Sequence, residues 1–316
     1  MKIVFLERKT LGDDIDLSAF EQYGEVVYYD ASVDDQVAER VHDADVVIAN
    51  KVHLNETTLG RAKNVKLICL TATGSDNLDK PWLEKAGIEW HNAAGYSTED
   101  VAQHTFALYF YLAEKLRTFD DFVKSGGYAA SRRFTWYGRI IEELHGKTWG
   151  IVGLGAIGRR VAQVAEAFGA RVIWYSTSGT AREEQYERVD DFAEFLGRCD
   201  VVSVHAPADE RTIGMMNAEA FSLMKNTAYF INVARGAIVN EPDLAAAIES
   251  GEIAGAGLDV LCEEPMNPAN PLFNIKDSEK LIITPHIAWA PLEARTRLMN
   301  IVEGHVRDYV NRRQSS

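Results

Sequence analysis

The stretch Lys147-Thr148-Trp149-Gly150-Ile151-Val152-Gly153-Leu154-Gly155-Ala156-Ile157-Gly158 decides the fold, because an apolar run changes there into a glycine-rich turn and then into a helical pattern. In such a turn Gly153 lets the chain reverse after a strand, Gly155 lets the backbone approach a pyrophosphate, and Gly158 lets the new helix pack on the strand. The helix that begins with Ala156-Ile157 would point its N–H groups at the phosphates, so no lysine is needed. The stretch therefore predicts a dinucleotide-binding turn.

Glycine-rich turns also join strands to helices in folds that bind nothing, so a purely structural turn is the alternative. The surrounding sequence favours binding. Residues 159–168 carry apolar side chains at helical spacing, Gly169 ends that helix, and residues 171–175 resume as a strand.

The composition is that of an ordinary globular protein. The 316 residues are 47% hydrophobic and 25% charged, which suggests two domains, and no apolar stretch is long enough to cross a bilayer. The net charge of −14 and the lack of a basic stripe disfavour nucleic acid and anionic membranes as partners. Three widely spaced cysteines and an N-terminus without a secretory pattern predict a cytoplasmic protein with reduced thiols and no metal site.

Short apolar runs alternate with helical stretches along the whole chain. This alternation predicts an α/β protein with two doubly wound, mostly parallel sheets. A long apolar helix from residue 98 to about 117 would connect the two halves, and a last helix over about 292–312 would return to the first half. The expected strands are 3–6, 26–29, 46–49, 67–70 and 88–92 in the first half, and a strand at Trp149 followed by 172–175, 201–205, 228–232, 255–260 and 281–284 in the second.

Two polar loops of the first half follow strand ends. One contains His53, and the other contains Gly74 and Ser75. Ligands of open α/β sheets gather at the carboxyl ends of strands, so both loops are candidates for a substrate site. The alternative is that they are simply polar turns, and for His53 alone the two interpretations are evenly balanced.

The strand ends of the second half carry a cation, carboxylates and an imidazole: Arg235, Asp259, Glu264 and His286. This set suits hydride chemistry on a 2-oxo acid. The arginine would hold the carboxylate and polarise the adjacent carbonyl, while the histidine, oriented by a carboxylate, would donate a proton. Each residue taken singly has a structural alternative, but their shared position at strand ends favours a site.

In its glycine turn and in these strand-end residues, the chain resembles the D-2-hydroxyacid dehydrogenase family over nearly its whole length. The motifs are Gly153–Gly158, His205-Ala206-Pro207, Asn232-Val233-Ala234-Arg235-Gly236, Gly257-Leu258-Asp259-Val260, Glu264-Pro265 and Thr284-Pro285-His286. Features around residues 71–77, 95–105 and 287–290 are most similar to the glycerate dehydrogenase (hydroxypyruvate reductase) branch.

The resemblance implies two Rossmann-like domains with a central cleft, and usually a homodimer. Residues 1–98, completed by 288–316, would form a flavodoxin-like substrate-binding domain, and residues 99–287 the dinucleotide-binding domain. The resemblance also implies that Arg235 anchors the substrate, that Glu264 pairs with His286, and that His286 is the acid–base residue.

Further residues are expected to contact ligands. Those expected at the substrate are His53, Gly74, Ser75, Tyr96, Arg235 and Trp289. Those expected at the cofactor are Gly153, Gly155, Ala156, Ile157, Gly158, Ser176, Thr177, Arg182, His205, Ala206, Pro207, Val233, Ala234, Asp259 and His286.

The chain departs from the NAD-specific pattern at Ser176. An acidic residue usually stands there and accepts hydrogen bonds from the adenosine ribose. Here the strand is followed by hydroxyl residues and Arg182, with no carboxylate to repel a 2′-phosphate. This predicts an NAD(P)H enzyme that tolerates or prefers NADP, whereas a Ser/Thr-rich turn that binds NAD through the pyrophosphate is the alternative.

The expected reaction is reduction of a small 2-oxo acid, hydroxypyruvate or glyoxylate, to the D-2-hydroxy acid. The same chemistry on pyruvate or on a larger or aromatic 2-oxo acid remains an alternative, as does an amino acid substrate. A dinucleotide-sensing module that binds partner proteins is the alternative from another functional class, although the complete set of Arg235, Glu264 and His286 argues against it.

Overall fold

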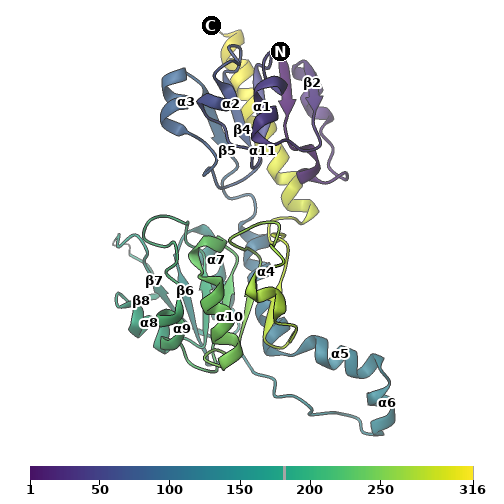
Figure 1. Ribbon diagram of the computed structural model, residues 1–316, viewed down its shortest axis with the longest axis vertical. Helices are drawn as coiled ribbons and strands as arrows, with labels where there is room; N and C mark the ends of the chain where they lie inside the picture. Colours follow the sequence, from purple (N-terminus) through teal and green to yellow (C-terminus); the bar gives the residue numbers. More distant parts are fainter. Residues whose placement is uncertain (181–182, 316) are drawn as a thin grey trace. The chain divides into compact units, whose positions relative to one another are not determined.

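The computed structural model describes residues 1–180 and 183–315. The chain divides into two compact units: Met1–Ser97 with Ala290–Ser316, and Thr98–Trp289 (Figure 1). Each contains one parallel sheet with helices beside it, so the predicted α/β class with two doubly wound sheets is confirmed.

The sheet of the first unit has the strand order β2-β1-β3-β4-β5, and every neighbouring pair is parallel. Its central strands β3 and β4 are buried at all four positions, as expected for a parallel sheet covered on both faces. The strands are β1 (Lys2–Phe5), β2 (Glu25–Tyr28), β3 (Val46–Ala49), β4 (Leu67–Leu70) and β5 (Glu89–Asn92).

The C-terminal helix α11 (Leu292–Gln314) returns to this first sheet and contacts β4 and β5, as expected (Figure 1). Its buried face includes Leu298, Val302 and Val306, which recur at helical spacing. The other helices of the unit are α1 (Asp34–Arg40), α2 (Glu56–Leu59), α3 (Lys80–Ala86) and the 3₁₀ turns η1 (Arg8–Leu11) and η2 (Ser18–Tyr23).

The sheet of the second unit has the order β12-β11-β10-β9-β6-β7-β8 and is also parallel throughout. The expected strands agree with the structure to within one or two residues at their ends, and the short β8 was not expected. The strands are β6 (Thr148–Val152), β7 (Arg171–Tyr175), β8 (Glu187–Arg188), β9 (Val201–Val204), β10 (Tyr229–Asn232), β11 (Gly255–Leu258) and β12 (Leu281–Ile283).

Helix α4 (Thr98–Ala113) packs directly on this second sheet. A Cβ on Gly257 of β11 would lie 2.9 Å from Leu108 Cβ, so only glycine permits the approach. The remaining helices are α7 (Ala156–Ala167), α8 (Phe192–Arg198), α9 (Ala218–Leu223), α10 (Glu241–Ser250), η3 (Gly236–Ile238) and η4 (Pro271–Asn274).

The prediction of one helix from residue 98 to about 117 is wrong. Helix α4 ends at Ala113, and Lys115 adopts a left-handed conformation with φ of 54°. Two further helices follow, α5 (Leu116–Lys124) and α6 (Gly127–Ser131), which extend away from the sheet of this unit (Figure 1). The apolar spacing continues across Lys115, which is why sequence alone did not reveal the break.

No helix in residues 1–180 and 183–315 combines the length and the apolar character needed to cross a membrane.

Candidate active site

The carboxyl ends of β6, β7, β9, β10, β11 and β12 all open at one edge of the second sheet, because these strands are neighbours and parallel. The glycine turn follows β6, and His205 follows β9. Arg235, Asp259 and His286 follow β10, β11 and β12, which are adjacent. The sheet therefore brings sequence-distant polar residues to a single edge.

The loop that carries Arg235 is fixed by its own backbone and by a close approach. Asn232 Oδ1 accepts from the Ala234 N–H at 3.0 Å, and Asn232 Nδ2 donates to the Arg235 carbonyl at 3.0 Å. A Cβ on Gly236 would lie 1.9 Å from the Leu261 carbonyl carbon, so glycine is required there. This contact places the Arg235 loop against the segment that leads to Glu264.

Glu264 and His286 form a hydrogen-bonded pair. His286 Nδ1 donates to Glu264 Oε2 at 2.7 Å, while Glu264 Oε1 accepts from the Leu261 N–H at 2.9 Å. Both side chains are partly exposed, at 26% and 34%. Because Nδ1 donates to the carboxylate, Nε2 is the nitrogen left to exchange a proton with a ligand.

Asp259 is buried against the loop of residues 284–288, which carries His286, and is 1% exposed. Its Oδ1 accepts from the Ile287 N–H at 2.9 Å and its Oδ2 from the Ala288 N–H at 2.8 Å. Burial raises the pKa of the Asp259 carboxyl, but hydrogen bonds from His104, from Thr284 and from these backbone N–H groups hold the net pKa below its ordinary value. The carboxylate is therefore charged and holds the loop, and its expected contact with a cofactor remains a prediction.

The glycine turn fits a dinucleotide on structural grounds. Gly153 has φ of 91°, and a Cβ there would lie 2.9 Å from Ala206 N, while a Cβ on Gly158 would lie 2.3 Å from the Gly153 carbonyl oxygen. A Cβ on Gly155 would meet nothing within 4 Å. Protein packing thus explains two of the three glycines, whereas the open space at Gly155 is what an approaching pyrophosphate requires.

The helix behind that turn is suited to an anion. Helix α7 has no acidic residue in its first turn, and in the part of the chain that the structure describes no side-chain hydrogen bond caps its N-terminus at Gly155. Ala156 is exposed and Ile157 partly exposed there. The first N–H groups of α7 are thus available to a phosphate.

A family model matches more than half of the chain. The model named "D-isomer specific 2-hydroxyacid dehydrogenase, NAD binding domain" matches residues 106–288.

The chain belongs to the D-isomer-specific 2-hydroxyacid dehydrogenase family.

Relatives agree over almost the full length. The chain is 33% identical to a hydroxypyruvate reductase of Blautia hydrogenotrophica, with 98% of this chain and 97% of the relative covered. It is also 33% identical to a glycerate dehydrogenase of Methylorubrum extorquens, with 98% and 96% covered. An acyclic imino acid reductase solved with NADPH and D-Arg superposes with a TM-score of 0.86 at 26% identity, covering 99% and 98% of the two chains. The resemblance to this family and to its hydroxypyruvate reductase branch is thereby confirmed.

A D-2-hydroxyacid dehydrogenase is an NAD(P)-dependent oxidoreductase, so the predicted enzyme class is confirmed and a nicotinamide dinucleotide is its cofactor. The roles expected for individual residues remain predictions. The geometry still shows what each residue contacts.

His205 belongs to a buried polar chain. Trp149 Nε1 donates to Ser203 Oγ at 2.8 Å, and Ser203 Oγ lies 2.9 Å from His205 Nε2. Trp149 Nε1 can only donate, so Ser203 Oγ is the acceptor of that bond. Burial lowers the pKa of His205 to about 3. Its neighbour Ala206 lies against Gly153, which places this segment beside the glycine turn.

The turn after β7 gathers hydroxyl groups. Ser178 Oγ lies 3.5 Å from Ser176 Oγ and donates to Thr180 Oγ1 at 3.0 Å. Arg188 donates to the carbonyls of Thr180 and Gly179 at 3.0 and 3.4 Å, and these two bonds stabilise the turn. The expected contact at Arg182 lies outside the described residues.

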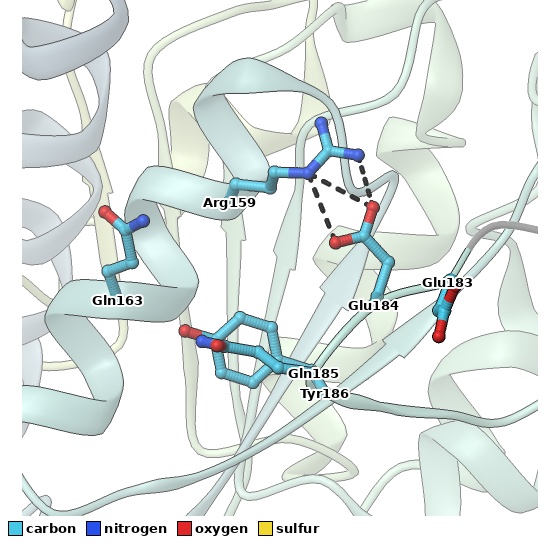
Figure 2. A pocket seen from close by; sticks show the side chains of 6 residues that line it. All are labelled: Arg159, Gln163, Glu183, Glu184, Gln185 and Tyr186. Carbon is cyan, nitrogen blue, oxygen red and sulfur yellow. Dashed lines mark hydrogen bonds and ion pairs between the residues drawn. The ribbon is translucent and has the colours of Figure 1, made fainter.

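A pocket of ≈ 440 Å³ lies beside α7, and Figure 2 shows Arg159 paired with Glu184 among the residues that line it. Arg159 Nε donates to both Glu184 oxygens at 3.2 and 3.3 Å, and a terminal nitrogen also contacts this carboxylate. The cation that directly follows Gly158 is therefore already paired with a carboxylate.

The candidate substrate residues of the first unit sit in ordered loops. His53 Nδ1 donates to Asp34 Oδ2 at 2.8 Å, which fixes an otherwise exposed ring. Gly74 and Ser75 are partly exposed in the loop after β4, and Tyr96 is 6% exposed. Trp289, also partly exposed, ends the second unit.

Sequence reasoning missed two residues with clear structural roles. The Glu7 carboxylate accepts from the N–H groups of Asn50, Lys51 and Val52 at 2.6 to 3.4 Å and so orders the loop before His53. His104 on α4 contacts the Thr284 hydroxyl at 2.9 Å. An acidic residue directly after the first strand was the available signal for Glu7, whereas nothing local in sequence marks His104.

Proposed function

We propose that this D-2-hydroxyacid dehydrogenase reduces a small 2-oxo acid, hydroxypyruvate or glyoxylate, to the D-2-hydroxy acid. The observation that carries the proposal is the Glu264–His286 pair at the end of β12, two strands from Arg235 at the end of β10, on the edge that also carries the glycine turn. A cation, a proton donor and a dinucleotide turn on one edge meet the needs of this reaction.

Arg235 anchors the substrate carboxylate. A guanidinium offers two parallel N–H donors that match a carboxylate, and it polarises the adjacent carbonyl. The net charge of the chain is −14, so the electrostatic field of the whole protein repels a small anion. Binding of a 2-oxo acid therefore needs a cation at the site.

His286 donates the proton. The Glu264 carboxylate fixes the ring through Nδ1, which directs Nε2 to the substrate carbonyl oxygen. The nicotinamide dinucleotide, when bound, supplies the hydride that the carbonyl carbon accepts. Addition of this hydride and of the His286 proton converts the 2-oxo acid into the 2-hydroxy acid, and His286 regains its proton from water.

The proposal assigns the expected ligand contacts as follows. The second unit holds the dinucleotide through the glycine turn, Thr177, the 205–207 segment, and Val233-Ala234. The proposed substrate contacts are His53, Gly74, Ser75 and Tyr96 of the first unit, and Arg235 and Trp289 of the second. The hydroxypyruvate reductase relative supports a small polar substrate. A cytoplasmic location remains a prediction.

We also propose that the enzyme accepts NADPH. The turn after β7 presents the hydroxyls of Ser176, Ser178 and Thr180 and no carboxylate within residues 176–180. Because Arg159 is neutralised by Glu184, a 2′-phosphate would depend on these hydroxyls, on backbone donors and on Arg182, as the sequence predicts. The structural neighbour solved with NADPH supports this choice.

A second copy of the chain is the proposed partner. Helices α5 and α6 with the segment up to Ile141 form an arm that exposes large apolar side chains, with Phe134 92% and Ile140 84% exposed. Within the arm Trp136 stacks on Phe122 at 3.8 Å, so the arm is ordered while its apolar surface faces outward. Burial of this surface in a homodimer would account for it.

An imino acid is the second candidate substrate, because the solved neighbour at 26% identity is an acyclic imino acid reductase. The same hydride chemistry would act on a C=N bond instead of a C=O bond. The two candidates differ in one requirement: imine reduction needs an amine together with the 2-oxo acid.

The decisive assay follows nicotinamide absorbance with purified protein, crossing NADPH and NADH against hydroxypyruvate, glyoxylate, pyruvate and phenylpyruvate, each with and without an amine. Fast turnover of hydroxypyruvate without amine, lost in Arg235→Gln through a large rise in KM, supports the proposal. Turnover only with amine favours the imino acid, and preference for phenylpyruvate replaces the small substrate. Tight dinucleotide binding without any turnover would favour a sensor.

A further inference from the structure

His286 occupies a left-handed backbone conformation, with φ of 56°. A residue with a side chain adopts this region at a cost, and it persists only where the surroundings hold it. The His286 N–H itself makes only a short-range bond, to the Thr284 carbonyl at 3.0 Å. The next two N–H groups, of Ile287 and Ala288, bond to the two oxygens of Asp259. The orientation of His286 therefore depends on where the Asp259 carboxylate is held.

The Asp259 carboxylate is held by hydrogen bonds from Thr284 and His104. The Thr284 hydroxyl has one proton, and its 2.6 Å contact with Asp259 Oδ1 makes the carboxylate the acceptor. A lone pair of the hydroxyl then faces His104 Nε2 at 2.9 Å, and the same nitrogen lies 3.4 Å from Asp259 Oδ1. Both neighbours of Nε2 accept, so His104 carries a proton on Nε2 and donates to this pair.

Helix α4, which carries His104, packs on β11, the strand that Asp259 follows. Leu108 follows His104 by one helical turn on α4 and packs on Gly257, two residues before Asp259 on β11. The His104 ring is 18% exposed and its Nε2 is engaged by Thr284 and Asp259. This nitrogen is therefore directed at the support of the loop.

We propose that His104 is a positioning residue of this enzyme, which acts through Thr284 and Asp259 to hold His286 in its productive backbone conformation. The inference rests on the proposed role of His286 and adds to it a residue on a different helix. Removal of the His104 donor leaves the Thr284–Asp259 pair short of a hydrogen bond and loosens the 284–288 loop without removing any group that touches substrate.

The test compares His104→Leu with His104→Gln, since glutamine can place an N–H donor near the position of Nε2. Thr284→Val breaks the same chain at its middle and keeps the side-chain shape. His305→Leu, a histidine of α11 in the first unit, serves as the matched control. The measurements are hydrogen–deuterium exchange of the 284–288 amides, kcat and KM for the 2-oxo acid, and the Kd for the dinucleotide from tryptophan fluorescence.

We expect His104→Leu and Thr284→Val to speed exchange at Ile287 and Ala288 and to lower kcat about 10- to 100-fold, because small misplacement of a proton donor costs that much. KM and Kd should stay within about twofold of wild type, since no ligand contact is lost. His104→Gln should restore most of kcat, and His305→Leu should match wild type.

Unchanged exchange in His104→Leu overturns the proposal. Equal damage to kcat, KM and Kd that His104→Gln does not rescue also overturns it, because such damage indicates general unfolding. If wild type turns over none of the substrates, the proposed function fails, and exchange alone decides the coupling of His104 to the loop: faster exchange supports it, and unchanged exchange refutes it.

Discussion

The Glu264 carboxylate lies 2.7 Å from Nδ1 of His286, although 22 residues separate the two in sequence. The pair joins the segment after β11 to the segment after β12, which are neighbouring strands. Because Nδ1 is bonded to the carboxylate, Nε2 is the nitrogen left to exchange a proton.

His286→Ala should lower kcat about 10²- to 10⁴-fold, the usual contribution of a positioned general acid. Glu264→Gln keeps a hydrogen-bond acceptor but removes the charge, so its loss of kcat should be smaller while KM stays close to wild type. Steady-state kinetics on hydroxypyruvate measures both. Equal kcat in wild type and His286→Ala would exclude this histidine as the acid.

The glycine turn offers a matched pair of variants. Gly158→Ala places a Cβ 2.3 Å from the Gly153 carbonyl oxygen, so we expect a loss of about 1–3 kcal/mol in the free energy of unfolding. Gly155→Ala meets nothing within 4 Å, so its stability should equal wild type while the Kd for dinucleotide rises. Urea unfolding and calorimetric titration separate the two effects. Unweakened binding in Gly155→Ala would place the pyrophosphate elsewhere.

Cofactor choice is tested at Ser176. Ser176→Asp introduces a carboxylate where a 2′-phosphate is proposed to lie, and we expect the ratio of kcat/KM for NADPH over NADH to fall about tenfold or more, equivalent to about 1.4 kcal/mol. Ser176→Asn is the uncharged control of similar size. If Ser176→Asp leaves the ratio unchanged, this turn does not select the cofactor.

His205 makes stability depend on pH. Its pKa is lowered from 6.5 to about 3 in the folded state by burial, so between these values the unfolded chain binds a proton that the folded chain excludes. The free energy of unfolding should therefore fall as pH drops below 6.5, by up to about 1.4 kcal/mol per pH unit from this group. Urea unfolding of wild type and of the non-titrating His205→Gln at pH 7 and pH 5 measures the difference. A parallel decline in both proteins would contradict the prediction.

The arm tests the proposed homodimer. Phe134→Asp and Ile140→Asp put charges on its exposed apolar surface and should shift the protein from dimer to monomer in sedimentation experiments. Ile213→Asp, at a side chain 60% exposed outside the arm, is the control and should remain dimeric. A monomeric wild type, or a dimer that survives both arm variants, would show that the arm is not the interface.

Much of the fold and the site was predictable because parallel α/β proteins have a strong local pattern. Apolar runs such as 46–49 and 67–70 are strands at the positions expected, since a strand buried on both faces is apolar throughout. Arg235, Asp259 and His286 lie on one edge because they follow strands that prove to be neighbours.

The features that the sequence did not predict depend on contacts between residues distant in sequence. The break at Lys115 lies inside a continuous apolar pattern. The anchors Glu7 and His104 hold loops that are 43 and 180 residues away, and local spacing does not identify those partners.

The sequence by itself determined the family and the two parallel sheets, because glycine turns and apolar strand runs carry local geometric demands. Only the tertiary structure decided which nitrogen of His286 is bonded to Glu264 and that Asp259 holds the loop after His286. It also decided that Arg159 is already paired with Glu184. These properties depend on hydrogen bonds between strands, loops and helices that meet only after folding.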